Sequence, residues 1–398
     1  MILSILIALS FGILAGILTG LAPGIHINLV ALFLFIISTT LLKFTTPIIL
    51  VVFIIAMTIT HTFFDFLPSI FLGAPDESTA LSVLPGHSML LEGKGYEAIR
   101  ITTFGSLIGV FLILAISPFF VLVLPWFYDI TKKIMFFILI GASAFLILNE
   151  EKGKKFGAFL IFMLAGIIGI FSLNFYVVKQ ALFPMLTGLF GASMLVGSIN
   201  KKVNLPKQSL TFEKIEKKEI VKATFSSIIA APLCSFLPGI GAAQAAVIGS
   251  QFYKIKQKTF LLMLGIIGTL VAGLNFVALY AIGKPRSGVS VIVGKLLEIN
   301  LSQLILLLII MLVSGVIATF LVLRISKKFI FFIEKINYPK LCFWILVLLC
   351  FLTIAISGGF GLLILATATS LGILTNQMGI KKMHLMGCLL LPIILFYI

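Results

Sequence analysis

Apolar runs nearly as long as a lipid bilayer is thick recur along the whole chain. The 28 residues from 225 to 252, for example, contain no Asp, Glu, Lys or Arg. A helix needs about 20 apolar residues to cross the hydrocarbon core, and a transmembrane barrel would show alternating segments instead. We therefore expect an all-α, polytopic membrane protein with about 10–12 hydrophobic segments. The runs are 1–22, 25–42, 46–62, 99–125, 131–148, 155–172, 178–198, 225–252, 259–282, 301–323, 341–357, 359–375 and 383–397.

The composition supports this class. Of 398 residues, 61% are hydrophobic and 11% charged, and the mean hydropathy is +1.25, whereas a soluble domain carries about a quarter charged residues. The net charge of +16 comes mainly from basic residues in short loops. That distribution is typical of the positive-inside bias of membrane proteins, so we do not expect nucleic acid as a partner. The predicted location is the cell membrane, with the first apolar run retained as a helix.

Motifs of enzymes and metal sites are missing. The four cysteines lie in apolar segments without paired spacing, which indicates small buried side chains and no metal centre. The signatures of serine hydrolases, zinc proteases and P-loop ATPases do not occur. We predict no catalytic residues and no enzyme. An intramembrane hydrolase built on His61, Asp65 and Asp76 is a minor alternative.

A basic stretch divides the chain. Residues 201–222 contain seven Lys and three Glu and form the longest polar segment. We interpret this stretch as a cytoplasmic linker between a first transmembrane repeat, 1–200, and a second, 223–398. The other polar connections are shorter.

Two sequence matches support an internal duplication. Pro23-Gly24-Ile25 recurs 215 positions later as Pro238-Gly239-Ile240. The stretch 65–80 aligns without gaps to 275–290, which sets Asp65 opposite Asn275 and Gly73 opposite Gly283 at a separation of 210. Because both matches occur in the same order and at helix-breaking elements, they predict two structural repeats.

Each Pro-Gly element interrupts an apolar segment. The arms 225–237 and 240–252 have 13 residues each, so each rises about 20 Å, less than the roughly 30 Å hydrocarbon core. A re-entrant hairpin and a single broken span both fit this length, and placing the flanking basic loops on one side favours the hairpin. Paired breaks in a transporter lie near the bilayer midplane, where helix N-termini attract anions and C-termini attract cations. We expect 23–24 and 238–241 to meet there.

Polar residues near the breaks form two candidate sets. Intramembrane ionisable groups are usually functional. The alternatives are a satisfied His61–Asp65 pair at the membrane edge, and for Asp76 a structural ion pair with Arg286 or a solvated loop. The candidates for ion coupling are His61, Asp65, Asp76, Glu77 and Asn275. The candidates for binding a small anionic substrate are Pro23, Gly24, His26, Asn28, Pro238, Gly239, Gly241, Gln244, Lys284 and Arg286.

Several ordered motifs resemble one transporter family. The chain resembles the large membrane subunit of tripartite tricarboxylate transporters, the TctA family, over most of its length. The resemblance rests on GILAGILTGLAPGI, VLPGHSMLLEGKGYEAIRITTFGSLIGV, ALFPMLTGLFGASMLVGSI, IIAAPLCSFLPGIGA and LGILTNQMGIKKMHLMGCLLLP. It implies ion-coupled uptake of carboxylates such as citrate, together with a small membrane subunit and an extracytoplasmic solute-binding protein. It also implies that the Pro-Gly pairs are the paired break elements.

The sequence departs from that family in being shorter, with compressed loops, and in the charge of one stretch. GAPDEST places two acids, Asp76 and Glu77, where small, amide or hydroxyl residues suit a carboxylate site. We predict an ion-coupled secondary transporter for a tricarboxylate-like solute, with no cofactor beyond a coupling Na⁺ or H⁺. The alternatives are a stand-alone carrier of another anion, and a scaffold or lipid-handling protein without coupled transport.

Overall fold

The computed structural model describes residues 2–22, 27–73, 79–151, 153–178, 180–200, 206–236, 242–250, 253, 256–284, 287–333 and 338–397. The helices of the first half are α1 (Ile2–Leu21), α2 (Ile27–Ile36), α3 (Ser38–Leu41), α4 (Pro47–Phe64), η1 (Pro68–Leu72), η2 (Ala80–Ser82), α5 (Val83–Leu91), α6 (Gly95–Leu148), α7 (Lys155–Asn174), α8 (Leu182–Leu186), η3 (Thr187–Ala192) and α9 (Ser193–Asn200). Those of the second half are α10 (Lys217–Phe236), α11 (Ala242–Gly249), α12 (Gln257–Ile282), α13 (Gly288–Leu296), α14 (Leu301–Ile333), α15 (Tyr338–Ser357), α16 (Gly359–Gln377), η4 (Lys382–Met386) and α17 (Gly387–Phe396). Every described element is a helix, which confirms the predicted all-α class; η1 and η3 are π-helices.

Within the described residues, seven helices are long and apolar enough to cross a membrane. They are Ile2–Leu21, Pro47–Leu72, Gly95–Tyr128, Lys155–Asn174, Gln257–Ile282, Leu301–Phe331 and Gly359–Gln377. Further apolar helices of 10–17 residues, such as Phe136–Leu148 and Cys342–Ser357, are shorter than these spans. These lengths fit a membrane protein, and they explain why fewer long spans occur than the 10–12 hydrophobic segments predicted.

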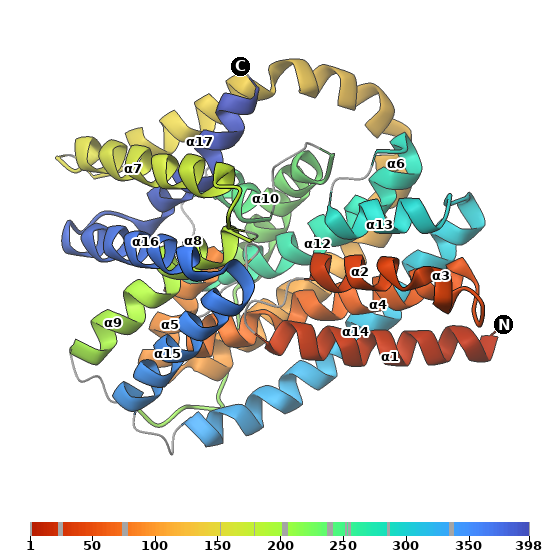
Figure 1. Cartoon of the computed structure of the whole chain (residues 1–398), viewed down its shortest axis with the longest axis horizontal. Helices are drawn as coiled ribbons and strands as arrows, with labels where there is room; N and C mark the ends of the chain where they lie inside the picture. Colours follow the sequence, from red (N-terminus) through yellow and green to blue (C-terminus); the bar gives the residue numbers. More distant parts are fainter. Residues whose placement is uncertain are drawn as a thin grey trace.

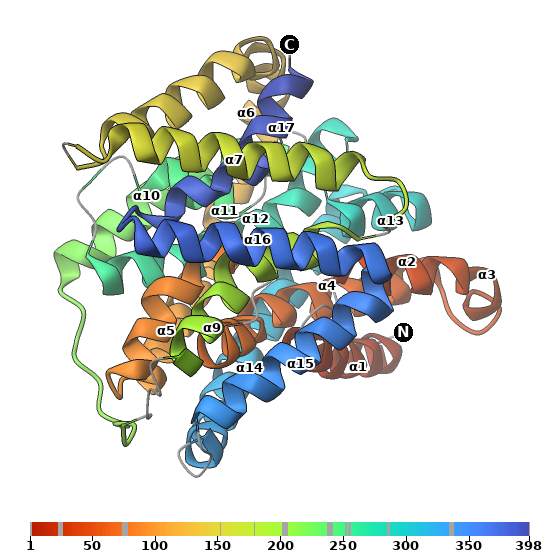
Figure 2. The same cartoon turned by 60° about the vertical axis from the view of Figure 1, so that its left-hand side comes forward.

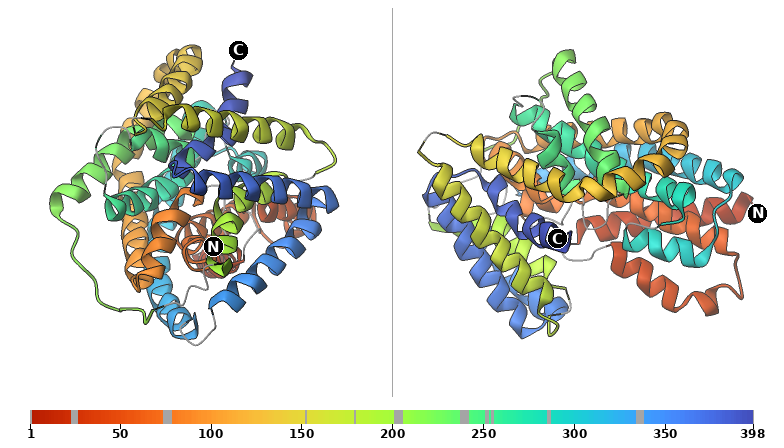
Figure 3. Two further views of the ribbon diagram at one scale, coloured as in Figure 1. Left: turned by 90° about the vertical axis from the view of Figure 1, so that its left-hand side faces the viewer. Right: turned by 90° about the horizontal axis from the view of Figure 1, so that it is seen from above.

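The helices pack in two groups. The first bundle contains α1, α2, α4, most of α6 and α10 to α14, and the second bundle contains α7 to α9 with α15 to α17. Figure 2 and the right panel of Figure 3 show α7 and α16 running side by side, away from the N-terminal helix α1. Each half of the sequence therefore supplies helices to both bundles. The predicted division at 201–222 separates two halves of the sequence, and both halves cross between the bundles.

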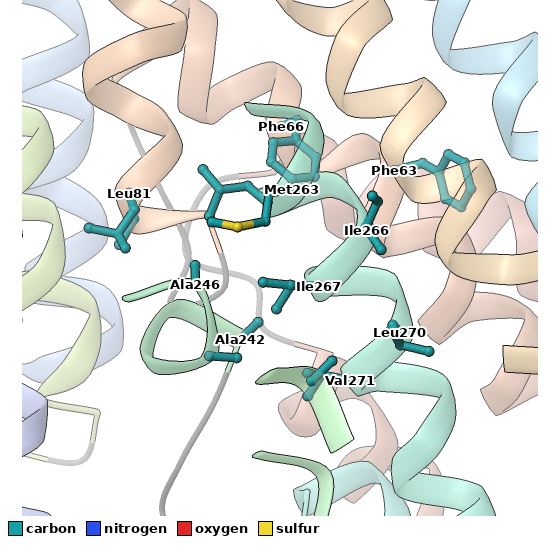
Figure 4. Close-up of a cluster of buried hydrophobic side chains, with 14 of the residues drawn as sticks. Phe63, Phe66, Leu81, Ala242, Ala246, Met263, Ile266, Ile267, Leu270 and Val271 are labelled. Atoms are coloured by element: carbon teal, nitrogen blue, oxygen red, sulfur yellow. The ribbon is translucent and has the colours of Figure 1, made fainter. Parts of the chain in front are cut away.

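Two spans form the centre of the first bundle. In the 18-residue apolar stretch of each span, the share of buried residues is 72% for Pro47–Leu72 and 89% for α12, against 33–39% for the other five. Figure 4 shows α12 side chains, among them Met263 and Ile267, between α4 and Ala242 of α11. The Thr62 and Thr269 hydroxyls, 3.0 Å apart, link the two spans. A polar side chain on either of these two spans is therefore surrounded by protein rather than by lipid.

Glycines bring α1 against α4. A Cβ on Gly12 would lie 2.5 Å from the Phe53 carbonyl oxygen, and one on Gly16 would lie 2.6 Å from that of Met57. Because the contact residue on α4 rises together with the residue number on α1, the two helices run parallel. Small residues at a membrane helix interface permit this close approach of the backbones.

Helix bounds in the two halves correspond. α1 and α10 both have 20 residues, and their first residues are 215 positions apart, as are those of α2 and α11. The spans Pro47–Leu72 and Gln257–Ile282 both have 26 residues at a separation of 210. Each is followed by a left-handed glycine, Gly73 or Gly283, with φ near +62°. Packing also corresponds, because α6 packs on α12 and α14 packs on α4.

Two sequence boundaries differ from prediction. The segments 99–125 and 131–148 belong to one 54-residue helix, α6, which contains Pro118 and Pro125 and turns across the top of the molecule in Figure 1. Proline kinks a helix without ending it when apolar surroundings favour internal backbone hydrogen bonds. Helix α10 begins at Lys217, inside the predicted linker, and residues 206–216 are not helical.

Candidate functional site

The end of α4 carries two buried ionisable residues. His61 and Asp65 are each 4% exposed, and the Asp65 N–H bonds to the His61 carbonyl at 3.0 Å. The helix therefore continues through Asp65, so the two side chains share one helix face as their spacing predicts. Both belong to the most interior part of the first bundle.

This face adjoins the C-terminal end of α1. The Thr19 hydroxyl donates to the Gly16 carbonyl at 3.2 Å, and its oxygen lies within hydrogen-bond distance of the His61 Nδ1, at 3.1 Å. A Cβ on Gly20 would lie 3.1 Å from the Asp65 backbone nitrogen. Helix C-termini present carbonyl oxygens with partial negative charge. The buried Asp65 belongs to the same region, and carboxylate and helix-carbonyl oxygens are groups that favour a cation.

The corresponding position of the second half carries an amide. Asn275 of α12 is 7% exposed, and its Oδ1 has no hydrogen-bond donor among the described residues. Position 271, which corresponds to His61, is Val271. The second half therefore offers a neutral polar oxygen where the first half offers a carboxylate and an imidazole. A carbonyl-type oxygen suits a hard cation, yet it adds no charge.

The structure gives contacts for two of the predicted substrate residues, Asn28 and Lys284. The Asn28 Oδ1 accepts from the Val289 N–H at 3.0 Å, at the start of α13, where Ser287 and Ser290 form a capping box. Asn28 thereby fixes α2 against α13. Lys284 is exposed, with its Nζ 4.7 Å from the centroid of the Tyr128 ring.

The remaining predicted site residues lie outside the described residues. They are Pro23, Gly24, His26, Asp76, Glu77, Pro238, Gly239, Gly241 and Arg286, together with the Gln244 side chain, whose backbone belongs to α11. Their positions as binding or coupling residues stay predictions. Within the described residues, no group of three or more His, Cys, Asp and Glu side chains is placed to hold a metal ion.

A buried lysine occupies the junction of the two bundles. Lys382, the first residue of η4, is 3% exposed, and its Nζ donates to the Ser193 Oγ at 3.3 Å. Ser193 starts α9 directly after η3. Across the junction, a Cβ on Gly73 would lie 3.8 Å from the Gly191 backbone. The π-helix η1 of the first bundle therefore ends beside η3 of the second.

Fixed contacts surround this lysine. The Ser193 hydroxyl donates to the Leu189 carbonyl at 2.8 Å, and a Cβ on Gly372 would lie 2.7 Å from the Ser193 Oγ. His87 of α5, fully buried, bonds through Nδ1 to the Ile70 carbonyl of η1 at 2.8 Å and is within electrostatic reach of Lys382. π-helical turns occur frequently at functional sites.

An ion cluster anchors the residues on either side of Lys382. The Glu150 carboxylate, 1% exposed, pairs with the His384 Nε2 at 2.7 Å and with the Lys381 Nζ at 3.3 Å. Burial raises the pKa of Glu150, but hydrogen bonds from His384, the Glu151 backbone N–H and Lys381, with the charge of Lys381, outweigh it and bring the pKa below its usual value. Glu150 is thus held as a carboxylate that fixes η4, while Lys382 between the two paired residues faces Ser193.

Sequence reasoning missed Lys382. It directly precedes the apolar run 383–397 and resembles a basic flank of a membrane segment. The sequence signal was a second lysine beside Lys381 in a stretch that is otherwise apolar, since an ionisable residue next to an intramembrane segment is a functional candidate. What it lacked was evidence of burial, which depends on packing against η3 and α9.

A separate groove opens near the start of α6. It has a volume of about 430 Å³ and is lined mainly by apolar side chains, including Phe104 and Leu107, with Arg100, Lys214 and Lys217 among its walls. The Arg100 guanidinium stacks 4.2 Å from the Phe212 ring centroid. The groove therefore combines an apolar lining with several basic side chains.

Comparisons with known proteins agree with these features. The chain is 33% identical over 409 aligned positions to "Uncharacterized protein MJ1079" of Methanocaldococcus jannaschii, and the alignment covers 99% of each chain. No solved structure matches the chain. The model of the tripartite tricarboxylate transporter TctA family matches residues 6–387, essentially the whole chain. The protein belongs to the tripartite tricarboxylate transporter TctA family, a family of membrane transporter components.

Proposed function

We propose that the chain is the membrane-embedded transport subunit of a secondary transporter, and that it takes up a small carboxylate by using a Na⁺ or H⁺ gradient. The observation that carries the coupling is the buried Asp65, whose backbone packs beside the C-terminal end of α1. A carboxylate and helix carbonyls favour a cation in this position. The carboxylate substrate comes from the family, whose name describes tricarboxylate transport.

Two repeats with re-entrant helices are the architecture we propose for this function. The matching helix bounds at separations of 215 and 210 support the repeats. A Cβ on Gly249, the last residue of α11, would lie 3.5 Å from atoms of Ala230 and Ser226 in α10. Helix α11 therefore runs back along α10, as the arms of a hairpin would. Transporters commonly bind solute where such repeats meet.

Partner subunits are part of the proposal. The family is the large component of a tripartite system, so we expect a small membrane subunit and an extracytoplasmic solute-binding protein to act with this chain in the cell membrane. Co-purification of the chain with candidate partner subunits, with and without substrate, tests this assembly. A stand-alone carrier of another anion is the outcome if uptake needs no partner.

Uptake into proteoliposomes tests the function. Purified chain, alone and with partner subunits, is reconstituted, and accumulation of radiolabelled citrate and succinate is measured under an imposed Na⁺ or proton gradient. We expect accumulation with one of the two gradients and its loss when an ionophore dissipates that gradient. Equal uptake in empty and protein-containing vesicles, for every carboxylate and both gradients, would contradict the proposal.

The groove beside Arg100 favours a second candidate function, the handling of anionic lipid. An apolar lining suits an acyl chain, and the Arg100, Lys214 and Lys217 side chains suit a phosphate headgroup. Mass spectrometry of lipid retained after purification distinguishes the two functions when combined with the uptake assay. Retained anionic lipid together with absent carboxylate uptake would favour lipid handling.

A further inference from the structure

Lys382 is the buried cation that the proposed coupling mechanism does not use. Its ammonium has three N–H groups. Among the described residues, one of them donates to the Ser193 Oγ at 3.3 Å, and no carboxylate lies within ion-pair distance of the Nζ. The nearby acid Glu150 is already paired with His384 and Lys381. Lys382 therefore retains donors that the described residues do not satisfy.

Ser193 does not compensate for the charge of Lys382. Its single hydroxyl hydrogen is used in the bond to the Leu189 carbonyl, so its oxygen serves as a neutral acceptor for Lys382. A buried ammonium without a counter-charge is costly, because it loses its hydration without gaining an ion pair. An anion placed at the two remaining N–H groups of Lys382 would remove that cost.

The position of Lys382 suits a translocated ligand. Ser193 and Lys382 belong to the second bundle, whereas His87 and the η1 carbonyl that it contacts belong to the first. Binding sites occur preferentially at the interfaces between such structural units. An anion held here would contact both bundles, so relative movement of the bundles would act on the ligand directly.

We propose that the Lys382 ammonium binds a carboxylate group of the transported solute, with Ser193 positioning the lysine; this inference rests on the proposed function. A carboxylate matches the site because one ammonium offers one unit of positive charge, and its two oxygens can accept from the two remaining N–H groups. Of the basic residues next to it in sequence, Lys381 is balanced by the single charge of Glu150, and His384 shares that carboxylate. The local charge therefore fits a single carboxylate better than a doubly charged phosphate.

Citrate binding to the purified full-length chain tests this inference, with sulfate as the control anion. We expect citrate to raise the melting temperature of the wild-type chain and to bind with a measurable Kd. Lys382→Met should weaken citrate binding about tenfold or more, which is roughly 1.4 kcal/mol. The matched control is Lys327→Met, at an exposed lysine of α14 in the first bundle, whose Nζ lies 5.7 Å from the centroid of the Tyr96 ring. We expect it to leave the Kd within about twofold, since 0.4 kcal/mol corresponds to that change.

The stability of the ligand-free variants provides a second readout. If Lys382 has no protein counter-ion, Lys382→Met removes an unpaired buried charge and should not lower the melting temperature. The segment 74–78 follows Gly73 and contains Asp76 and Glu77, so a protein ion pair is the competing arrangement. A Lys382→Met variant that melts lower, and regains stability when Asp76→Asn or Glu77→Gln is added, would overturn the inference.

The outcomes separate this inference from the proposed function. Unchanged citrate affinity in Lys382→Met, together with gradient-driven uptake by the wild-type chain, overturns the assignment of Lys382 alone. A wild-type chain that neither binds nor transports any carboxylate overturns both. Binding of sulfate at the same affinity as citrate, abolished by Lys382→Met, overturns the carboxylate assignment.

Discussion

The spans Pro47–Leu72 and α12 have the same length, the same central position and the same left-handed glycine after their last residue. They differ in chemistry. The first carries His61 and Asp65, and the second carries Val271 and Asn275 at the corresponding positions. The first also ends in a π-helix that begins at Pro68, where α12 has Ala278 and stays α-helical.

This difference indicates a division of labour between two similar scaffolds. Helix length, capping glycine and packing partners are the features needed to place a span at the centre of the bundle. Ionisable side chains in such a place are costly and are retained where they serve a function. Under the proposed function, ion coupling belongs to the first half, and the second half is an uncharged counterpart with the matching backbone.

The largest effect is expected from the substitution that removes the chemical difference between the two spans. Asp65→Asn gives the first span the same residue type as Asn275, and it should abolish gradient-driven uptake because the site loses its charge for the coupling cation. The melting temperature of the variant should remain close to that of the wild-type chain. Uptake under a Na⁺ or proton gradient, with calorimetry on the same preparation, measures both effects.

The reciprocal variant, Asn275→Asp, is the control. It adds a carboxylate to the second span, and we expect it to leave coupling through Asp65 in place. Retained gradient-driven uptake in Asp65→Asn would show that Asp65 is not the coupling group. A melting temperature that falls while uptake persists would identify Asp65 as a structural residue.

The π-helical end of the first span is the next difference to test. Gly73 donates its N–H to the Pro68 carbonyl, five residues back, and Pro68 itself has no N–H to donate. Pro68→Ala should restore an α-helical turn like that of α12 and shift the Ile70 carbonyl away from His87. We expect uptake to fall about tenfold, or roughly 1.4 kcal/mol, without loss of stability. Wild-type uptake in this variant would show that the π-helix has no role in transport.

Sequence patterns predicted the helical class, the apolar segments and the shared face of His61 and Asp65, because each depends on local spacing. The repeated Pro-Gly motif also predicted where helices of the two halves end. Pro23 follows the end of α1 in the sequence, and Pro238 follows the end of α10 by the same number of residues. Lys382 was not predicted because its burial depends on Ser193, 189 positions earlier in the chain. The continuity of α6 was also missed, because the polar residues Asp129, Lys132 and Lys133 interrupt the apolar sequence, whereas the helix continues through them.

Glycine packing provides a smaller contrast between the halves. A methyl group at Gly16 of α1 would lie 2.6 Å from both the Met57 carbonyl oxygen and the Thr60 Cβ, and position 231, which corresponds to it in α10, is already Ala231. Gly16→Ala should lower the free energy of unfolding by about 1–3 kcal/mol through overpacking. Thermal denaturation in detergent measures this loss.

Gly268 of α12 is the matched control for Gly16. A Cβ there would meet no atom within 4 Å, so Gly268→Ala should raise stability by about 1 kcal/mol, the usual gain in helix propensity. Equal melting temperatures for the Gly16→Ala variant and the wild-type chain would contradict the close approach of α1 and α4.

The smallest effect is expected at Lys284, which sequence reasoning had placed in the substrate site of the second half. Its side chain is exposed, and its Nζ lies over the Tyr128 ring at 4.7 Å. An exposed cation–π contact contributes about 0.5–1 kcal/mol to stability and nothing to a buried anion. Lys284→Gln should therefore leave substrate affinity within about twofold, or 0.4 kcal/mol, while lowering the melting temperature slightly.

Comparison of Lys284→Gln with Lys382→Met separates the effect of an exposed lysine from that of a buried lysine. A tenfold loss of affinity in Lys284→Gln would show that Lys284 takes part in substrate binding. It would contradict the proposed difference between the halves, because a substrate-binding cation would then lie directly after the uncharged span α12.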